Sequence, residues 1–139
     1  MFCLWRTAVV MSYHSEKLRI LLVEDTPYIL RNSQVMLEKL NCDITVATTY
    51  AEALEKFDLS FDGILTDIGL PDGNGCDFVK WIAENHPDNK AIIYVYSAFS
   101  INYIEEKIKN LPIQSYFTKP YSEKDMQNFV NAVLINKRM

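Results

Sequence analysis

The chain has 139 residues, 49% hydrophobic and 23% charged, so it is long enough for one domain with a substantial core and too apolar for a disordered protein. A formal net charge of -4 argues against direct binding to nucleic acid through a broad basic surface. No apolar run approaches the roughly 20 residues that span a bilayer. Cys3, Cys42 and Cys76 lack the paired spacing of a zinc site or redox motif. A cytoplasmic protein with reduced thiols is expected.

The first 17 residues are set apart from the predicted domain. Residues 1–10 contain several large apolar side chains, but Arg6 interrupts them and the stretch is too short for a signal peptide. Met11 is an alternative start, and the segment could equally be the end of an upstream linker. We therefore predict an N-terminal extension or linker over residues 1–17 and one domain over residues 18–139.

Five short apolar runs predict the strands of a sheet. Residues 18–23 (LRILLV) are almost continuously apolar, which is typical of a strand buried on both faces. The similar runs that follow are residues 44–47, 63–66, 91–96 and 115–118.

Between these runs, apolar residues recur at the spacing of one helix face. The three clearest stripes are Tyr50, Ala53, Leu54 and Phe57; Ile101, Ile104, Ile108 and Leu111; and Met126, Phe129, Val130, Val133 and Leu134. The last stripe follows acidic residues and precedes basic ones, which suits the helix dipole. Five strand signals alternating with five helix signals predict an α/β fold, a doubly wound parallel sheet with helices on both faces.

Three acids lie at or just after the ends of predicted strands: Glu24 and Asp25 after the first, and Asp67 after the third. A parallel sheet gathers such residues at one edge, where clustered carboxylates repel one another unless a cation neutralises them. Magnesium is the best candidate because it prefers oxygen ligands.

Each acid also has a purely structural interpretation. Glu24 and Asp25 precede a helix start at which Thr26 or Asp25 would be the N-cap and Pro27 the first helical residue. Asp67 leads into a turn over residues 69–73, whose Gly and Pro content requires a loop.

Two more polar residues follow the fourth and fifth predicted strands. Ser97 could donate a hydrogen bond to a phosphoryl oxygen or could cap the helix that begins near Ile101. Lys119 would bring an ammonium group to the same edge as the acids, although a lysine before a turn is usually a solvated surface residue.

Taken together, the acid pair, the acid, the hydroxyl and the lysine resemble the receiver domains of response regulators. The matching pieces are LLVED at 21–25, DIGLPDG at 67–73, Ser97-Ala98 and Thr118-Lys119-Pro120, and their order and spacing cover nearly all of residues 18–139. These chemotaxis-regulator-like domains act in bacterial two-component and phosphorelay systems, some within hybrid sensor histidine kinases. The resemblance implies a flavodoxin-like receiver fold with five strands in the order 2-1-3-4-5.

The resemblance also implies a mechanism. Asp67 would attack a phosphohistidine of a histidine kinase or phosphotransfer protein and form an aspartyl phosphate. Lys119 would supply a positive charge and Ser97 a hydrogen bond to the phosphoryl group. The implied magnesium ligands are Glu24, Asp25, Asp67 and the backbone carbonyl of Gly69. The domain would not be an enzyme in the usual sense, but would catalyse its own phosphorylation and dephosphorylation.

Tyr116 matches the family's aromatic switch residue, which turns inward as the hydroxyl residue moves; a half-buried strand tyrosine is the plain alternative. The switch would change the face built by the fourth helix, fifth strand and fifth helix, which would also support a homodimer. Three features depart from the family pattern. Residues 110–113 (NLPI) replace the usual small pair before the fifth strand, Ser97 stands where Thr is frequent, and Phe99 is bulky enough to restrict attacking water.

Three other functions are weighed. An aspartate-nucleophile phosphatase usually needs a second acid two residues after the nucleophile, where this chain has Gly69. A flavodoxin-like cofactor binder needs a loop rich in Ser, Thr or Gly after the first strand to hold a phosphate, and this chain lacks such a loop. Both functions are therefore disfavoured. A degenerate receiver that only docks proteins would not need all five site positions to carry competent residues. Whether the receiver is a stand-alone relay protein or part of a hybrid kinase stays open.

Overall fold

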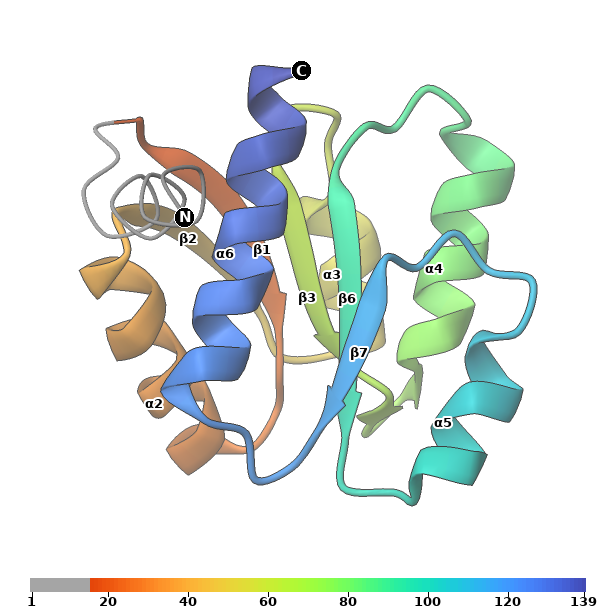
Figure 1. Cartoon of the computed structure of the whole chain (residues 1–139). Helices are drawn as coiled ribbons and strands as arrows, with labels where there is room; N and C mark the ends of the chain where they lie inside the picture. Colours follow the sequence, from red (N-terminus) through yellow and green to blue (C-terminus); the bar gives the residue numbers. More distant parts are fainter. Residues whose placement is uncertain (1–15) are drawn as a thin grey trace.

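The apolar runs form a sheet of five parallel strands in the computed structural model, which describes residues 16–139 (Figure 1). These strands are β1 (Leu18–Val23), β2 (Cys42–Ala47), β3 (Gly63–Asp67), β6 (Ile92–Ser97) and β7 (Ser115–Thr118). Their order across the sheet is β2-β1-β3-β6-β7, which confirms the expected order 2-1-3-4-5 when the five strands are counted along the chain.

Helices cover both faces of this sheet. They are α2 (Pro27–Lys39), α3 (Tyr50–Lys56), α4 (Gly75–Asn85), α5 (Ile101–Ile108) and α6 (Glu123–Arg138). Figure 1 shows α2 and α6 against one face, with α3, α4 and α5 against the other. The predicted doubly wound α/β architecture is therefore confirmed. Within the described residues, no helix is long and apolar enough to cross a membrane.

The side chains of β1 explain why the sheet needs two helical layers. Leu21 and Val23 belong to the apolar cluster beneath α3, α4 and α5, whereas Ile20 and Leu22 belong to the cluster beneath α2 and α6. Successive residues of a strand point to opposite faces, so a continuously apolar strand is stable only when both faces are covered.

A few element boundaries differ from the prediction. Strand β2 begins at Cys42, two residues before the predicted start, and α3 ends at Lys56 with Phe57 as its C-cap. Helix α5 ends at Ile108, so Leu111 lies beyond the helix although it still packs against the core. Apart from its last two residues, the proposed extension over residues 1–17 lies outside the described part of the chain.

The predicted turn after Asp67 is a small hairpin. Strands β4 (Gly69–Leu70) and β5 (Gly73–Asn74) pair antiparallel, with Pro71 and Asp72 at the turn. The Asp72 carboxylate accepts hydrogen bonds from the backbone N–H groups of Tyr50 and Ala51 at the start of α3 (2.6 and 3.0 Å). The hairpin is thereby tied to the neighbouring helix, which steadies the chain directly after Asp67.

Candidate functional site

The sequence-predicted site residues lie at the carboxyl edge of the sheet. Glu24 and Asp25 directly follow β1, Asp67 is the last residue of β3, Ser97 is the last residue of β6, and Lys119 directly follows β7. Because β1, β3, β6 and β7 are adjacent and parallel, their carboxyl ends meet at one edge.

Asp67 is buried and held by two donors. Only 5% of the residue is exposed. Its Oδ2 accepts a hydrogen bond from Lys119 Nζ at 2.8 Å, and its Oδ1 accepts one from the Gly69 backbone N–H at 3.2 Å. Burial raises the pKa of Asp67 and Glu24 raises it further, which together outweigh the lowering effect of the Lys119 ammonium. Removing this carboxylate from water therefore has an energetic penalty that the ion pair only partly offsets.

Glu24 is fully buried, and in the described part of the chain its carboxylate accepts two hydrogen bonds and forms an ion pair with Lys119. The Tyr96 hydroxyl donates to Oε1 at 2.8 Å, and Lys119 Nζ lies 3.1 Å from the same oxygen. The backbone N–H of Thr26 donates to Oε2 at 2.9 Å. Of the two predicted N-cap candidates for α2, Thr26 and Asp25, the N-cap is Thr26. Its side chain makes no capping hydrogen bond.

Lys119 joins the two buried acids. Its ammonium contacts both Asp67 and Glu24, and it lies 5.1 Å from the centre of the Tyr96 ring. Burial by itself would lower the pKa of Lys119, but the hydrogen bond and charge of Asp67 and the charge of Glu24 raise it above its usual value. Lys119 is thus a charged, half-buried residue and not a solvated surface lysine.

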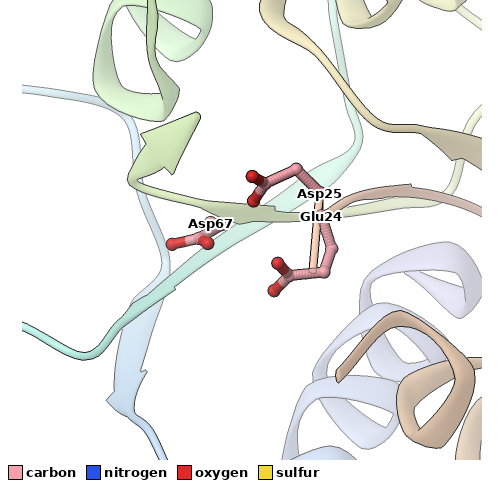
Figure 2. Close-up of side chains that lie close together, drawn as sticks. All are labelled: Glu24, Asp25 and Asp67. Atoms are coloured by element: carbon pink, nitrogen blue, oxygen red, sulfur yellow. The ribbon is translucent and has the colours of Figure 1, made fainter. Parts of the chain in front are cut away.

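Asp25 completes an acidic cluster at the open side of this edge. Glu24, Asp25 and Asp67 each offer a carboxylate oxygen, and these oxygens lie within 4.8 Å of one another. Figure 2 shows the three side chains side by side, two from the end of β1 and one from the end of β3. Clustered carboxylate oxygens, one of them on an exposed residue, suit a hard divalent cation such as Mg²⁺.

Ser97 shapes the loop beside the acids. Its buried hydroxyl accepts a hydrogen bond from the backbone N–H of Phe99 at 3.0 Å, and its carbonyl accepts one from the backbone N–H of Lys119 at 2.8 Å. The capping alternative for Ser97 is wrong because Ser100, which accepts from the Tyr103 N–H, is the N-cap of α5. Ser97 is not a helix cap but the last residue of β6. It directly follows Tyr96, the residue that pairs with Asp67 in the sheet.

Phe99 and Tyr116 lie on the α5 side of the site. A Cβ added to Gly69 would lie 3.7 Å from Phe99 Cε2, so the aromatic ring lies over the residue two positions after Asp67. The Tyr116 hydroxyl donates to Glu105 Oε2 of α5 at 2.9 Å. The structure brings the acids and Lys119 together, while Tyr116 is engaged with α5.

Two contributors escaped the sequence-based prediction. Tyr96 lies in a buried, mostly apolar strand, and its phenolic oxygen was the signal that it needs a polar partner. Gly75 packs so closely against the chain that a Cβ there would lie 2.0 Å from the Asp67 carbonyl oxygen. Its N–H also donates to the Ile68 carbonyl at 2.8 Å. In the sequence, only the glycine at position 75 hinted at a close approach of the backbone, and it did not show that the partner is Asp67.

Comparisons with known proteins agree with this architecture. The sequence pattern of the response regulator receiver domain family matches residues 20–131. The protein PilG of Pseudomonas aeruginosa is 24% identical over 88% of this chain and 91% of its own length. The chemotaxis protein CheV1 of Helicobacter pylori is 30% identical over 83% of this chain but only 37% of its own length.

Among solved structures, a similar one is the receiver domain of the sensor histidine kinase PA1611 from Pseudomonas aeruginosa PAO1, described with a magnesium ion coordinated in its active site cleft. It superposes with a TM-score of 0.76 at 22% identity, covering 86% of this chain and 98% of that domain. The fold, the strand-end acids and the match over residues 20–131 lead to one conclusion: the chain belongs to the response regulator receiver domain family.

Proposed function

We propose that this receiver domain, residues 18–139, accepts a phosphoryl group on Asp67 from a phosphohistidine of a histidine kinase or histidine phosphotransfer protein. The observation that carries the proposal is the Lys119 ammonium held between two buried carboxylates, 2.8 Å from Asp67 and 3.1 Å from Glu24. A buried cation beside a carboxylate at a parallel sheet edge offsets the charge of an incoming phosphate.

In the proposed transfer, an oxygen of Asp67 forms a bond to phosphorus while the phosphorus–nitrogen bond of the phosphohistidine breaks. The imidazole nitrogen keeps the bonding electron pair and takes up a proton. Lys119 holds Asp67 in place and stabilises charge on the transferring group, and Ser97 then donates a hydrogen bond to the bound phosphoryl group. The hairpin β4–β5 and Gly75 keep the backbone around Asp67 fixed during the reaction.

Glu24, Asp25, Asp67 and the backbone carbonyl of Gly69 are the proposed magnesium ligands. Bound Mg²⁺ would supply positive charge for the phosphoryl oxygens. The support for this set is the grouping of the three carboxylates and the type of donor atom they offer.

Phosphorylation is proposed to switch the face formed by α5, β7 and α6. Hydrogen bonding of Ser97 to the phosphoryl group would draw in the loop that carries Phe99, and Tyr116 would leave Glu105 and turn inward. Partners of this face, including a second copy of the chain, would then bind with changed affinity. Direct binding to nucleic acid is not part of the proposal.

The lifetime of the phosphate is proposed to depend on Phe99, whose ring lies over Gly69. The phosphoryl group should be lost several-fold faster from a Phe99→Ala variant than from the wild type. Ile101→Ala, which changes an exposed apolar residue at the start of α5, should leave the rate of loss unchanged. Equal decay of the two variants would remove Phe99 from the account.

The direct experiment mixes the purified protein with Mg²⁺ and a small phosphodonor such as acetyl phosphate, beside an Asp67→Asn control. The wild type should gain one acid-stable, base-labile phosphoryl group and the control none. A control that labels equally well contradicts the proposal and favours a docking-only receiver. Adding a histidine phosphotransfer protein then tests the relay role, in a stand-alone protein or a hybrid kinase, because a relay receiver should pass the label on.

A further inference from the structure

The Tyr96 hydroxyl of β6 forms a hydrogen bond with a member of the acidic cluster. Tyr96 is fully buried and lies opposite Asp67 in the β3–β6 ladder. Its hydroxyl donates to Glu24 Oε1 at 2.8 Å, while its ring packs edge-on against Tyr121, with ring centres 5.6 Å apart. Tyr121 in turn is hydrogen bonded to Ser33 of α2. Tyr96 is therefore fixed on both sides, with its hydroxyl directed at one carboxylate.

Counting the acceptor sites of Glu24 shows what this bond achieves. A carboxylate offers about four lone-pair sites, two on each oxygen. Among the described residues, Tyr96 donates to Oε1, which the Lys119 ammonium also contacts at 3.1 Å as an ion pair, and the Thr26 N–H donates to Oε2. Oε1 is thus engaged by two groups and Oε2 by one, so Oε2 is the oxygen more open to a cation or to a water molecule bound to it.

The same bond limits the hold of Glu24 on Lys119. Lys119 Nζ lies 2.8 Å from Asp67 and 3.1 Å from Glu24, so the ammonium is closer to Asp67. Without the Tyr96 hydroxyl, Lys119 would be the only group of residues 16–139 that contacts Glu24 Oε1. The ammonium would then be drawn toward Glu24 and away from Asp67, because an unsatisfied buried carboxylate oxygen is costly.

We propose that Tyr96 is a positioning residue of the phosphoacceptor site: its hydroxyl locks the Glu24 carboxylate so that Oε2 faces the divalent cation, and it keeps Lys119 on Asp67. This inference rests on the proposed function and adds a residue that acts through Glu24. Tyr94, two residues earlier on the same strand, supplies the contrast. It is buried in the same apolar cluster, but its hydroxyl forms no hydrogen bond with residues 16–139.

The test is a calorimetric titration of Mg²⁺ into three proteins without a phosphodonor: wild type, Tyr96→Phe and the matched control Tyr94→Phe. Loss of a residue that orients a metal ligand typically weakens metal binding on the order of tenfold. Tyr96→Phe should therefore bind Mg²⁺ about tenfold more weakly, and Tyr94→Phe should stay within about twofold of wild type. Wild-type affinity in Tyr96→Phe overturns the inference.

A second pair of variants separates positioning from general support of the fold. In a Glu24→Ala background, Tyr96→Phe should not weaken Mg²⁺ binding any further, because the hydroxyl has lost the group it orients. An undiminished tenfold effect in that background would show that Tyr96 acts on the fold as a whole and would overturn the inference.

A measurement on the wild type covers the case in which Tyr96→Phe does not fold. With ¹³C-labelled tyrosine, the Cζ resonance of Tyr96 should move during the Mg²⁺ titration while that of Tyr94 stays in place. A stationary Tyr96 resonance would overturn the inference. A wild type that shows the predicted Mg²⁺ behaviour yet takes no label on Asp67 would instead defeat only the proposed phosphoacceptor function.

Discussion

Two hydrogen bonds of nearly equal length lie on opposite sides of β7. Lys119 Nζ donates to Asp67 at 2.8 Å among buried groups, and the Tyr116 hydroxyl donates to Glu105 at 2.9 Å at the surface. Water can replace the second bond when it breaks, whereas nothing in the described part of the chain replaces the first. Burial, and not bond length, decides which of the two contacts matters for stability.

The largest expected effect comes from removing the buried ammonium. Lys119→Met should lower the free energy of unfolding by about 3 kcal/mol, because Glu24 and Asp67 would be left without their cation. Urea unfolding without Mg²⁺ measures this. Lys137→Met is the control, since its ion pair with Asp62 is partly exposed and should contribute less than about 1 kcal/mol. Similar losses in both variants would refute the role given to burial.

The second effect tests how tightly the chain packs behind Asp67. Gly75→Ala should destabilise the fold by about 2 kcal/mol and reduce phosphorylation, because the new Cβ would lie 2.0 Å from the Asp67 carbonyl oxygen. Gly69→Ala is the matched control, because its Cβ would make an ordinary contact at 3.7 Å. If Gly75→Ala unfolds at the wild-type urea concentration, the close approach has no energetic importance.

The third effect has the opposite sign. Burial raises the pKa of Asp67, so its ionisation opposes folding, and Asp67→Asn should be more stable than wild type at neutral pH without Mg²⁺. This advantage should shrink as the pH falls through the raised pKa, because the wild-type carboxyl then becomes neutral.

The matched acid for this test is Asp58. Hydrogen bonds from Ser60 lower the pKa of Asp58 in the folded protein. Ionised Asp58 therefore stabilises the fold at a pH above its unfolded-state pKa, and this stabilisation is lost as the pH falls through the lowered pKa. Asp58→Asn should therefore be slightly less stable than wild type at neutral pH. Thermal unfolding from acidic to neutral pH gives both trends, and a gain that is independent of pH for Asp67→Asn would contradict the assignment.

The smallest effect belongs to the surface bond. Tyr116→Phe should unfold at the same urea concentration as wild type, because water replaces the contact with Glu105. Tyr96→Phe, the same change at a buried hydroxyl, should unfold at a clearly lower concentration. Equal midpoints for the two variants would contradict the contrast between buried and exposed hydrogen bonds.

The sequence predicts the strands and their order well because burial on both faces leaves a nearly continuous apolar signal, as in β1. It also places Glu24, Asp25, Asp67 and Lys119 at one edge, since residues after parallel strands converge there. Helix ends are less clear, and Leu111 shows why: an apolar residue can continue the helical spacing after Asn110 has already left the helix with a φ of 67°.

Other parts of the site depend on contacts that only the folded chain creates. The bond from Tyr96 to Glu24 spans 72 positions, and the fit of Gly75 against Asp67 depends on the path of the hairpin. No local pattern encodes either contact. Tyr96 lies within β6 and Gly75 is the first residue of α4, so only the three-dimensional arrangement connects them to the acids.

The central claim is that Asp67 is the carboxylate that receives the phosphoryl group. After reaction with acetyl phosphate and Mg²⁺, borohydride reduces an aspartyl phosphate to homoserine, and peptide mass spectrometry locates the converted residue. We predict conversion at Asp67 alone, lost in Lys119→Met. Conversion at Glu24 or Asp25 instead, or none in a folded and Mg²⁺-bound protein, would contradict the account.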